Sequence, residues 1–266
     1  MKDPRQLFPG TLVIVAPHQD DETLGCGGLI ALLAGQREIH VVFATDGARS
    51  PVLAGGPANP GLVATREGEA REALGRLGVP PEHAHFLRFP DGRLSDDDPE
   101  FRKSLGAALK AIAPATILVP FRYDWHPDHL TVHRVTAALN RQGALAVTLV
   151  EYFVYTQRRL LPGGDVRACL EPTSLWPVET ASVATLKREA LECFRSQTTR
   201  FFDWQQRPIL TPDVLTRACH SPEIFLPTTN GLATRTLIPP WWIGLASTLE
   251  PRLKRAKDGL QSWITR

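Results

Sequence analysis

Short apolar runs alternate with amphipathic stretches along the first 155 residues, and this alternation limits the possible folds more than any other feature. The apolar runs predict five buried strands, at residues 11–16, 38–45, 84–89, 116–121 and 146–155. Helical patterns lie between them, at residues 22–35, 65–77, 99–113 and 127–139. Such repeats predict an α/β, Rossmann-like, mainly parallel sheet with helices on both faces. Right-handed crossovers would place the active site at the C-terminal ends of the strands.

Composition narrows the class of protein further. The 266 residues suit one domain with a modest extension, and the 30 basic against 28 acidic residues give no reason to expect a nucleic-acid partner. Residues 1–10 carry charges and do not read as a signal peptide, and no run approaches the ~20 apolar residues that span a bilayer. The four cysteines are far apart and predict free thiols. We therefore expect a cytoplasmic protein.

The pattern weakens after residue 156. A helix is predicted over residues 180–196, and the proline-rich remainder gives no clear period. We expect residues 1–230 to form the main domain and residues 231–266 to form a C-terminal extension, first apolar and aromatic and then a basic helix. Its aromatic residues either cover the core of the same domain or make peripheral contact with a membrane surface.

Two polar clusters follow predicted buried strands, and each contains histidine and aspartate. They are Pro17-His18-Gln19-Asp20-Asp21-Glu22 and Asp124-Trp125-His126-Pro127-Asp128-His129. Charged groups that leave a buried strand are usually paired, hydrogen-bonded or metal-bound. Because the clusters share one edge of the sheet, we expect a single divided site that binds a metal.

The residue types match a hydrolytic zinc site, which uses about three protein ligands and leaves one position open. His18, Asp21 and His129 would supply two imidazoles and one carboxylate. Asp20 can take a proton from the attacking water and pass it to a leaving amine, while a protonated His126 can stabilise the oxyanion. Asp128 either orients His126 or stabilises the start of its helix. The sequence therefore predicts metal-assisted hydrolysis.

Together the two clusters resemble the PIG-L/LmbE-like N-acetylglucosaminyl deacetylases, which are zinc-dependent amidases. The resemblance covers roughly residues 11–226 and continues through Thr45-Asp46-Gly47, Arg66 with Glu69-Ala70, Phe89-Pro90-Asp91-Gly92, Lys187 with Arg195-Ser196-Gln197, and Glu223-Ile224-Phe225. It implies one Zn2+ per chain and a small-molecule or lipid-linked amino-sugar substrate. The implied roles are metal ligands for His18, Asp21 and His129, general base for Asp20, oxyanion stabiliser for His126, and sugar-pocket lining for Arg66 and Asp91.

One position departs from the family pattern. Gln19 stands where the family usually has proline, which would fix φ and remove an N–H donor. The spacing of the ligands is unchanged, so we expect activity to survive this substitution. Two other functions remain open on the same residues: an esterase or phosphoesterase, and a sugar-binding module without turnover.

Several of these residues also have purely structural interpretations. Asp20 or Asp21 can cap a helix, and Arg66 can pair with Glu69 one turn along a helix. Asp46-Gly47 and Asp91-Gly92 can be turns alone. Glu151 either reaches the site from the fifth strand or is a charged edge residue, and His133 is either a surface helix residue or a group that supports the site from behind the ligands. Cys26 is expected in the core, and the sequence suggests no partner for His83, His85 and His220.

Overall fold

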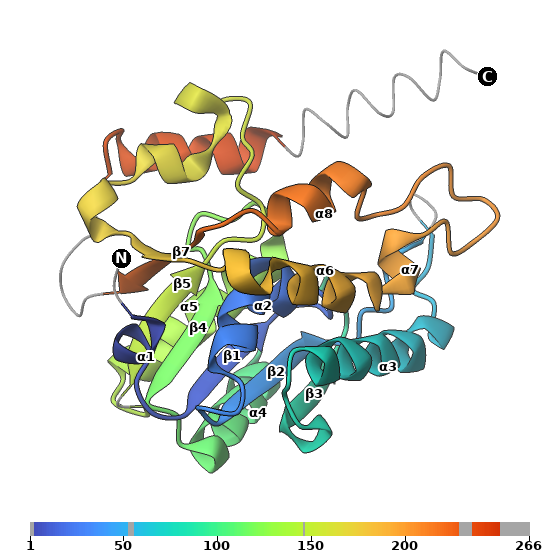
Figure 1. Ribbon diagram of the computed structural model, residues 1–266. Coiled ribbons are helices and arrows are strands. Elements are labelled where there is room, and N and C mark those ends of the chain that lie inside the picture. The colour runs from blue at the N-terminus through green and yellow to red at the C-terminus, as the bar shows by residue number, and fades with distance from the viewer. Residues whose placement is uncertain (1–2, 53–55, 146, 229–235, 251–266) are drawn as a thin grey trace.

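The computed structural model describes residues 3–52, 56–145, 147–228 and 236–250, and within them one twisted sheet of seven strands forms the centre of the molecule (Figure 1). The strand order is β3-β2-β1-β4-β5-β7-β6. Strands β1 to β5 run parallel, whereas β7 is antiparallel to both β5 and β6. The strands are β1 (Leu12–Ala16), β2 (Ile39–Thr45), β3 (Ala84–Phe89), β4 (Thr116–Pro120), β5 (Thr148–Tyr152), β6 (Trp176–Val178) and β7 (Glu223–Thr228).

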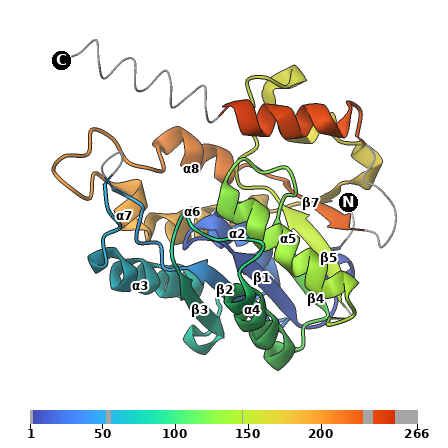
Figure 2. The same cartoon turned by 180° about the vertical axis from the view of Figure 1, so that it is seen from behind.

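Helices cover both faces of this sheet. The α-helices are α1 (Pro4–Leu7), α2 (Asp21–Leu33), α3 (Gly61–Arg76), α4 (Pro99–Ile112), α5 (Pro127–Arg141), α6 (Ala184–Glu192), α7 (Arg195–Thr198) and α8 (Pro212–Ala218). The short 3-10 helices are η1 (Pro81–His83), η2 (Pro162–Gly164), η3 (Val166–Cys169), η4 (Pro172–Ser174) and η5 (Ala181–Val183). Helices α2, α3 and α6 lie on one face, and α4 and α5 lie on the other (Figure 2). The predicted α/β, mainly parallel architecture is confirmed.

The alternation of side chains along β1 explains why this strand is apolar throughout. Leu12 and Ile14 pack into the core under α2 and α3, while Val13 and Val15 pack into the core under α4 and α5. All five residues of the strand are buried, as expected for a strand that is covered on both faces. On the first face, helix α2 lies so close to the start of η5 and to β7 that a Cβ at Gly28 would collide with Thr180 and Glu223.

Several elements differ from the predicted ones, most of them by one or two residues at an end. Helix α3 begins at Gly61 rather than at residue 65, and Asn59 Oδ1 accepts a hydrogen bond from the Gly61 N–H in its first turn. Strand β5 ends at Tyr152, three residues early. The single helix predicted over residues 180–196 is divided into η5, α6 and α7, because Phe194 leaves helical geometry (φ −78°, ψ 62°). Strands β6 and β7 were missed: each is short or carries proline, and antiparallel pairing between distant segments leaves no local period.

Part of the predicted C-terminal extension is described. Residues 240–250 are helical, and Ile243 and Ala246 are buried in an apolar cluster with Phe121 and Phe153. The predicted boundary at residue 230 and the predicted basic helix over 252–266 lie outside the described residues. Among the residues that the structure describes, no helix is both long and apolar enough to span a bilayer.

Candidate metal centre

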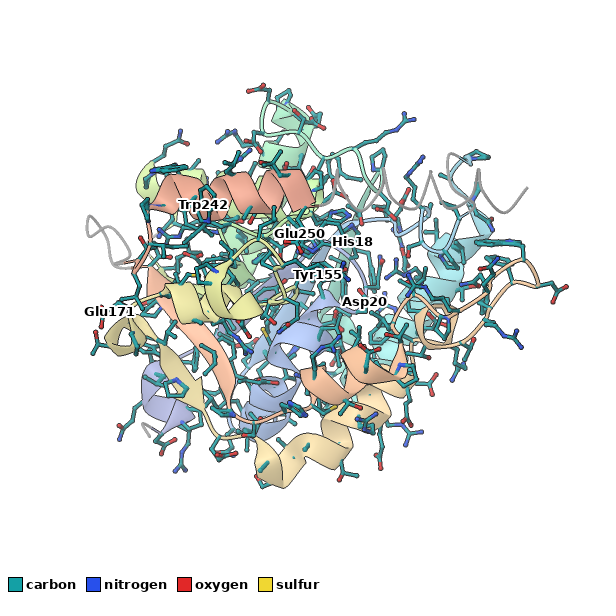
Figure 3. All side chains as sticks on the ribbon, turned by 90° about the horizontal axis from the view of Figure 1, so that it is seen from above. His18, Asp20, Tyr155, Glu171, Trp242 and Glu250 are labelled. Carbon is teal, nitrogen blue, oxygen red and sulfur yellow. The ribbon has the colours of Figure 1, made fainter. Side chains whose placement is uncertain are left out.

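The two polar clusters meet where the strand order reverses direction. From β1 the chain proceeds outward to β2 and β3 on one side, and β4 and β5 lie on the other side. Crossovers that leave in opposite directions open a crevice at the carboxyl ends of the two central strands. His18 and Asp20 follow β1, and the 124–129 cluster follows β4. Viewed from above, His18, Asp20 and Tyr155 lie near one another (Figure 3).

Two of the predicted metal ligands, His18 and His129, converge on a carboxylate oxygen of the third, Asp21. Asp21 Oδ2 lies 3.0 Å from His18 Nδ1 and 3.1 Å from His129 Nε2. All three side chains are buried. His126 also approaches this set, since one ring nitrogen each from His18, His126 and His129 all lie within 4.8 Å of one another. The structure therefore brings together the donor atoms that the sequence predicted from two segments more than 100 residues apart.

The second nitrogen of each imidazole faces another carboxylate. His18 Nε2 lies 3.2 Å from Asp128 Oδ2 and 3.3 Å from Asp91 Oδ1, and His129 Nδ1 lies 3.3 Å from Asp124 Oδ2. Carboxylates in this position fix the tautomer and the orientation of metal-binding histidines. No role for Asp124 was predicted from the sequence. It could have been, because a metal-binding histidine usually donates its second N–H to a carboxylate, and Asp124 lies in the same cluster as His129.

The electrostatics of the centre favour a cation. Burial alone would lower the pKa of His129, but Asp21 and Asp124 outweigh it and raise that pKa to about 9. Against the same effect of burial, hydrogen bonds to Asp128, Asp21 and Asp91 raise the pKa of His18 well above its ordinary value. Burial alone would oppose positive charge on these rings, so the raised pKa values show how strongly the surrounding carboxylates favour a cation here.

The donor set fits a divalent metal. Two imidazoles and one carboxylate are a common hydrolytic zinc combination. His129 is fully buried, yet neither of its ring nitrogens makes a well-formed hydrogen bond within the described structure. Buried polar atoms normally have a partner. A cation between His18, Asp21 and His129 would satisfy that requirement for Nε2.

Asp20 lies beside these ligands in an unusual backbone conformation. Its φ of 137° is rarely adopted by L residues, and such strain concentrates at functional sites. Burial raises the pKa of its carboxyl group to about 7, although the Arg66 guanidinium opposes the shift. The Asp20 N–H donates to Glu22 Oε2, and burial raises the pKa of Glu22 to about 8. A carboxyl group that titrates near neutrality suits a general base.

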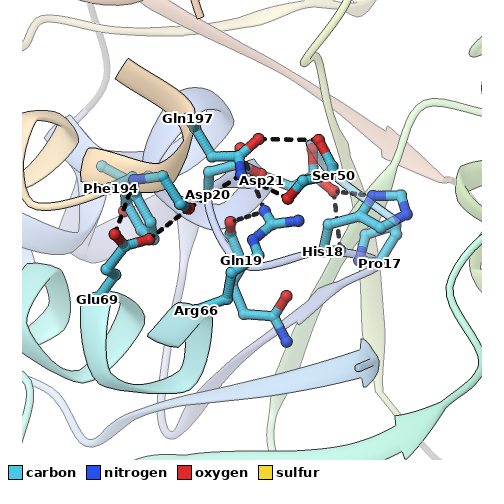
Figure 4. A network of polar contacts seen from close by, with 12 residues as sticks. Pro17, His18, Gln19, Asp20, Asp21, Ser50, Arg66, Glu69, Phe194 and Gln197 are labelled. Atoms are coloured by element: carbon cyan, nitrogen blue, oxygen red, sulfur yellow. Dashed lines mark hydrogen bonds and ion pairs between the residues drawn. The ribbon is translucent and has the colours of Figure 1, made fainter. Parts of the chain in front are cut away.

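Arg66 holds the turn that carries Asp20 (Figure 4). It is almost fully buried, its Nη2 donates to the carbonyl of Gln19, and it lies 3.4 Å from Asp20 Oδ2. The alternative prediction of an Arg66–Glu69 pair is wrong. Glu69 instead accepts hydrogen bonds from the backbone N–H and the hydroxyl of Ser196 in α7, because α3 and α7 pack together.

Gln19 connects the same turn to the end of β2. Its side-chain amide donates to the Thr45 carbonyl at 2.9 Å, and the residue is fully buried. Gly47 beneath it has φ +66°, and a Cβ there would collide with Gln19 Oε1. The side chain therefore supplies a tether that is compatible with the predicted ligand spacing.

Asp128 lies in the first turn of α5, which fits one of its two predicted roles. The Asp128 carboxylate contacts His18 rather than orienting His126, because loop N–H groups of Gly92 and Leu94 hold it there. The backbone N–H of Asp128 donates to His126 Nδ1 at 3.3 Å, which leaves the proton of a neutral ring on Nε2. Burial, followed by the charges of His18 and His129, lowers the pKa of His126 to about 4. A neutral His126 ring that donates from Nε2 is therefore favoured over a charged one.

The remaining predicted residues divide into confirmed and corrected ones. Cys26 is a buried core residue, as predicted. Glu151 is not at an edge: β5 lies between β4 and β7, and the fully buried carboxylate pairs with Arg122. His133 is half-buried, with Nδ1 3.0 Å from the Pro120 carbonyl, rather than free on the surface.

The predicted turn at Asp46-Gly47 fits the contacts of the Asp46 side chain. Asp46 Oδ1 accepts hydrogen bonds from the backbone N–H groups of Ala48 and Asp91.

Tyr155 is a neighbour of the centre that sequence reasoning missed. Its ring stacks on His129, with 5.5 Å between centroids, and contacts Trp125 edge to face. The predicted fifth strand, residues 146–155, includes Tyr155, whereas in the structure Tyr155 lies in the loop that follows β5. A strand predicted to end at residue 152 would have placed Tyr155 among the loop residues at the carboxyl edge of the sheet.

Comparison with known proteins agrees with this geometry. Residues 13–140 match the family model described as PIG-L, GlcNAc-PI de-N-acetylase. A 1D-myo-inositol 2-acetamido-2-deoxy-alpha-D-glucopyranoside deacetylase from Rhodococcus jostii (strain RHA1) is 31% identical over 71% of this chain and 82% of its own length.

Solved structures share the fold at lower identity. The N,N'-diacetylchitobiose deacetylase from Pyrococcus horikoshii superposes with a TM-score of 0.63 at 22% identity, over 85% of this chain and 86% of its own. GalB, the 4-carboxy-2-hydroxymuconate hydratase from Pseudomonas putida KT2440, superposes at 0.58 with 19% identity, over 85% and 99%. One fold thus carries more than one reaction, so the function must be argued from the site. By its sequence and its fold, the chain belongs to the PIG-L family.

Proposed function

We propose that this protein is a zinc-dependent deacetylase that removes the acetyl group from an N-acetylated amino sugar. The observation that carries the proposal is the convergence of His18 Nδ1 and His129 Nε2 on Asp21 Oδ2, with Asp20 directly beside them. Two imidazoles and one carboxylate leave a position open for reaction. The deacetylase names of the curated relatives favour amide cleavage over the phosphoesterase and binding-module alternatives.

The chain supplies the acid–base chemistry around the metal. A bound Zn2+ would polarise the amide carbonyl and make water more acidic. Asp20, with a carboxyl pKa of about 7, takes the proton of the attacking water and returns it to the leaving amine. His126 Nε2–H donates to the oxygen that becomes negative during the attack. Neither step requires an additional charged group.

The resemblance implied that Arg66 and Asp91 line the sugar pocket, and this remains a prediction. Both are buried, and their described polar contacts are with other protein groups. Arg66 contacts the turn and carboxylate of Asp20, and Asp91 contacts His18. These contacts favour a positioning role, in which each residue acts on the sugar only through Asp20 or His18.

The proposal extends to the kind of substrate. The relatives act, by their names, on an N-acetylglucosamine group joined to inositol, so a small glycoconjugate is the first substrate to test. A lipid-linked version would require contact with a membrane. Trp241 and Trp242 are exposed on the helix over residues 240–250, and five basic residues follow within residues 252–266. Aromatic and basic side chains together suit an anionic lipid surface.

Two experiments test these proposals separately. Zinc-loaded protein incubated with N-acetylglucosamine conjugates should release acetate in proportion to free amine, and phosphate release without acetate would reject the deacetylase. Sedimentation with anionic vesicles should carry the full chain down, and Trp241→Ser should weaken that binding several-fold. If the protein does not sediment with such vesicles, the membrane contact is excluded while the deacetylase proposal stands.

A further inference from the structure

Three histidines gather at the opposite edge of the sheet from the candidate metal centre. His40 lies in β2, His83 ends η1, and His85 lies in β3, so all three are near the amino ends of two neighbouring parallel strands. The His40 and His83 rings stack with 3.9 Å between centroids, and the His40 and His85 centroids are 5.3 Å apart. The catalytic proposal uses none of them.

A carboxylate completes a set of donors around His40. Glu38 Oε1 lies 3.1 Å from His40 Nε2, and one ligand atom each from Glu38, His40 and His83 all lie within 4.8 Å of one another. Ligands of a tetrahedral zinc ion, each about 2.0–2.1 Å from the metal, are about 3.4 Å apart. The existing spacing therefore needs only modest side-chain rotation to close around an ion.

Hydrogen bonds to the other ring atoms prepare these donors. His83 Nδ1 lies 2.9 Å from the Ile39 carbonyl, which only accepts, so the neutral ring keeps its lone pair on Nε2. Thr11 donates its hydroxyl to Glu38 Oε2, leaving Oε1 toward His40. Metal-binding histidines usually donate their second N–H to a carbonyl or carboxylate in this way.

The tautomer of His85 decides what can occupy the space between His40 and Glu38. Its Nε2 lies 3.0 Å from His40 Nδ1. When His40 Nδ1–H donates to His85, His40 Nε2 presents a lone pair to the Glu38 carboxylate, and two acceptors at 3.1 Å repel each other. A cation or a proton between them removes the repulsion, so metal and proton compete for one position.

The cluster is open to solvent. A cavity of about 390 Å3 adjoins it, lined among others by Arg37, Glu38, Gly78 and His83. The Glu38 side chain is 57% exposed, so a hydrated ion can reach it and retain water as a further ligand. The imidazole content selects zinc, copper or nickel over magnesium or calcium, which prefer oxygen donors alone.

We propose that Glu38, His40 and His83 form a second divalent-cation site, for Zn2+ or a similar transition metal, with His85 as a positioning residue. This site is independent of the catalytic centre: it lies at the other end of the strands and shares no residue with it. The proposal does not require the protein to be a deacetylase.

Calorimetry of the full, metal-stripped chain titrated with Zn2+ alone tests the proposal. Wild type should bind two equivalents, whereas His83→Ala and Glu38→Gln should each lose the weaker one or weaken it at least about ten-fold. His129→Ala should retain that equivalent while losing the other. His220→Ala, at an exposed histidine in another region, is the matched control and should bind like wild type. Both tested positions are at least partly exposed, which protects the fold from the substitution.

The same titration can overturn the proposal. Zinc binding that stays unchanged in both His83→Ala and Glu38→Gln, whether wild type binds one equivalent or two, excludes this site. A second equivalent that disappears only in His129→Ala would place both ions at the catalytic centre and also exclude it. Acetate release is not part of the readout, so failure of the deacetylase proposal would be seen separately.

Discussion

The two ends of the parallel strands gather histidines in different surroundings. At the carboxyl edge, both ring nitrogens of His18 and of His129 face carboxylates, supplied by four aspartates. At the amino edge, Glu38 is the one carboxylate that pairs with His40 among the described residues, and the His85 imidazole faces the other ring nitrogen. The carboxyl edge is buried, and the amino edge is partly open.

This difference has a physical consequence for cation binding. Surrounding carboxylates raise the pKa of His18 and His129, whereas burial and the charges of His40 and His83 lower the pKa of His85. Carboxylates that orient ligands and concentrate negative charge raise metal affinity. We therefore expect a tight ion at the carboxyl edge and a weak, exchangeable one at the amino edge.

The strongest test removes a ligand from each edge. His129→Ala should abolish tight zinc binding and lower turnover by about a thousand-fold or more, because the metal contributes several kcal/mol to the transition state. His83→Ala should leave turnover unchanged, since its ring is at the other end of the sheet. Metal analysis measures the zinc content of both variants, and acetate release measures their turnover. Equal loss of turnover in the two variants would contradict the separation of the edges.

Asp20 distinguishes catalysis from metal binding at the carboxyl edge. Asp20→Asn should lower kcat by about 10²–10⁴-fold, typical of the loss of a general base, while the zinc content stays that of wild type. Retention of full rate would refute the general-base assignment. Loss of zinc would instead make Asp20 a ligand.

The pH profile of turnover tests the same assignment without a substitution. Asp20 acts as a base only when deprotonated, and burial raises its pKa to about 7. Turnover per bound substrate should therefore fall as the pH is lowered through an inflection at or below about 7, because a bound cation lowers the pKa of a neighbouring carboxyl group. Arg66 opposes the shift, so Arg66→Gln should move the inflection to higher pH. A profile flat between pH 5 and 8 would argue against Asp20.

The surrounding carboxylates should have an intermediate effect. Asp124→Asn removes the charge that faces His129 Nδ1 and should weaken zinc binding about 10–100-fold, as is typical of such partners. Asp96→Asn, at a partly exposed pair with Arg134, is the control and should leave affinity unchanged. Competition with a chelator measures both. Equal affinity in the two variants would mean that the carboxylate environment does not set the difference between the edges.

Gln19 should give the smallest effect. Gln19→Leu removes the hydrogen bond to the Thr45 carbonyl and should raise the Zn2+ dissociation constant a few-fold, because the ligand-bearing turn is less restrained. Gln19→Pro should restore much of that affinity by fixing φ instead, provided the turn accepts the ring. Identical dissociation constants for all three proteins would show that the tether does not hold the ligands.

Local patterns were sufficient for much of the fold and for placing the proposed ligands at one edge of the sheet. Both bounds of strand Ala84–Phe89 were predicted correctly. Strand β1 was identified because both of its faces are covered, so that all five of its residues are apolar and form one continuous run. His18, Asp21 and His129 were predicted because each follows a strand that ends at one edge. The antiparallel strands β6 and β7 were missed, since their partners are set by contacts far away in the chain.

The sequence by itself determined which residue types reach the carboxyl edge, because strand direction and strand ends follow from local periodicity. Only the tertiary structure decided which carboxylate faces which imidazole. Asp128 contacts His18 rather than His126, and Asp124 contacts His129, because the loop after β3 supplies N–H groups that fix the Asp128 carboxylate. The tertiary structure also decided that His40, His83 and His85 lie together, since their contact depends on the pairing of β2 with β3.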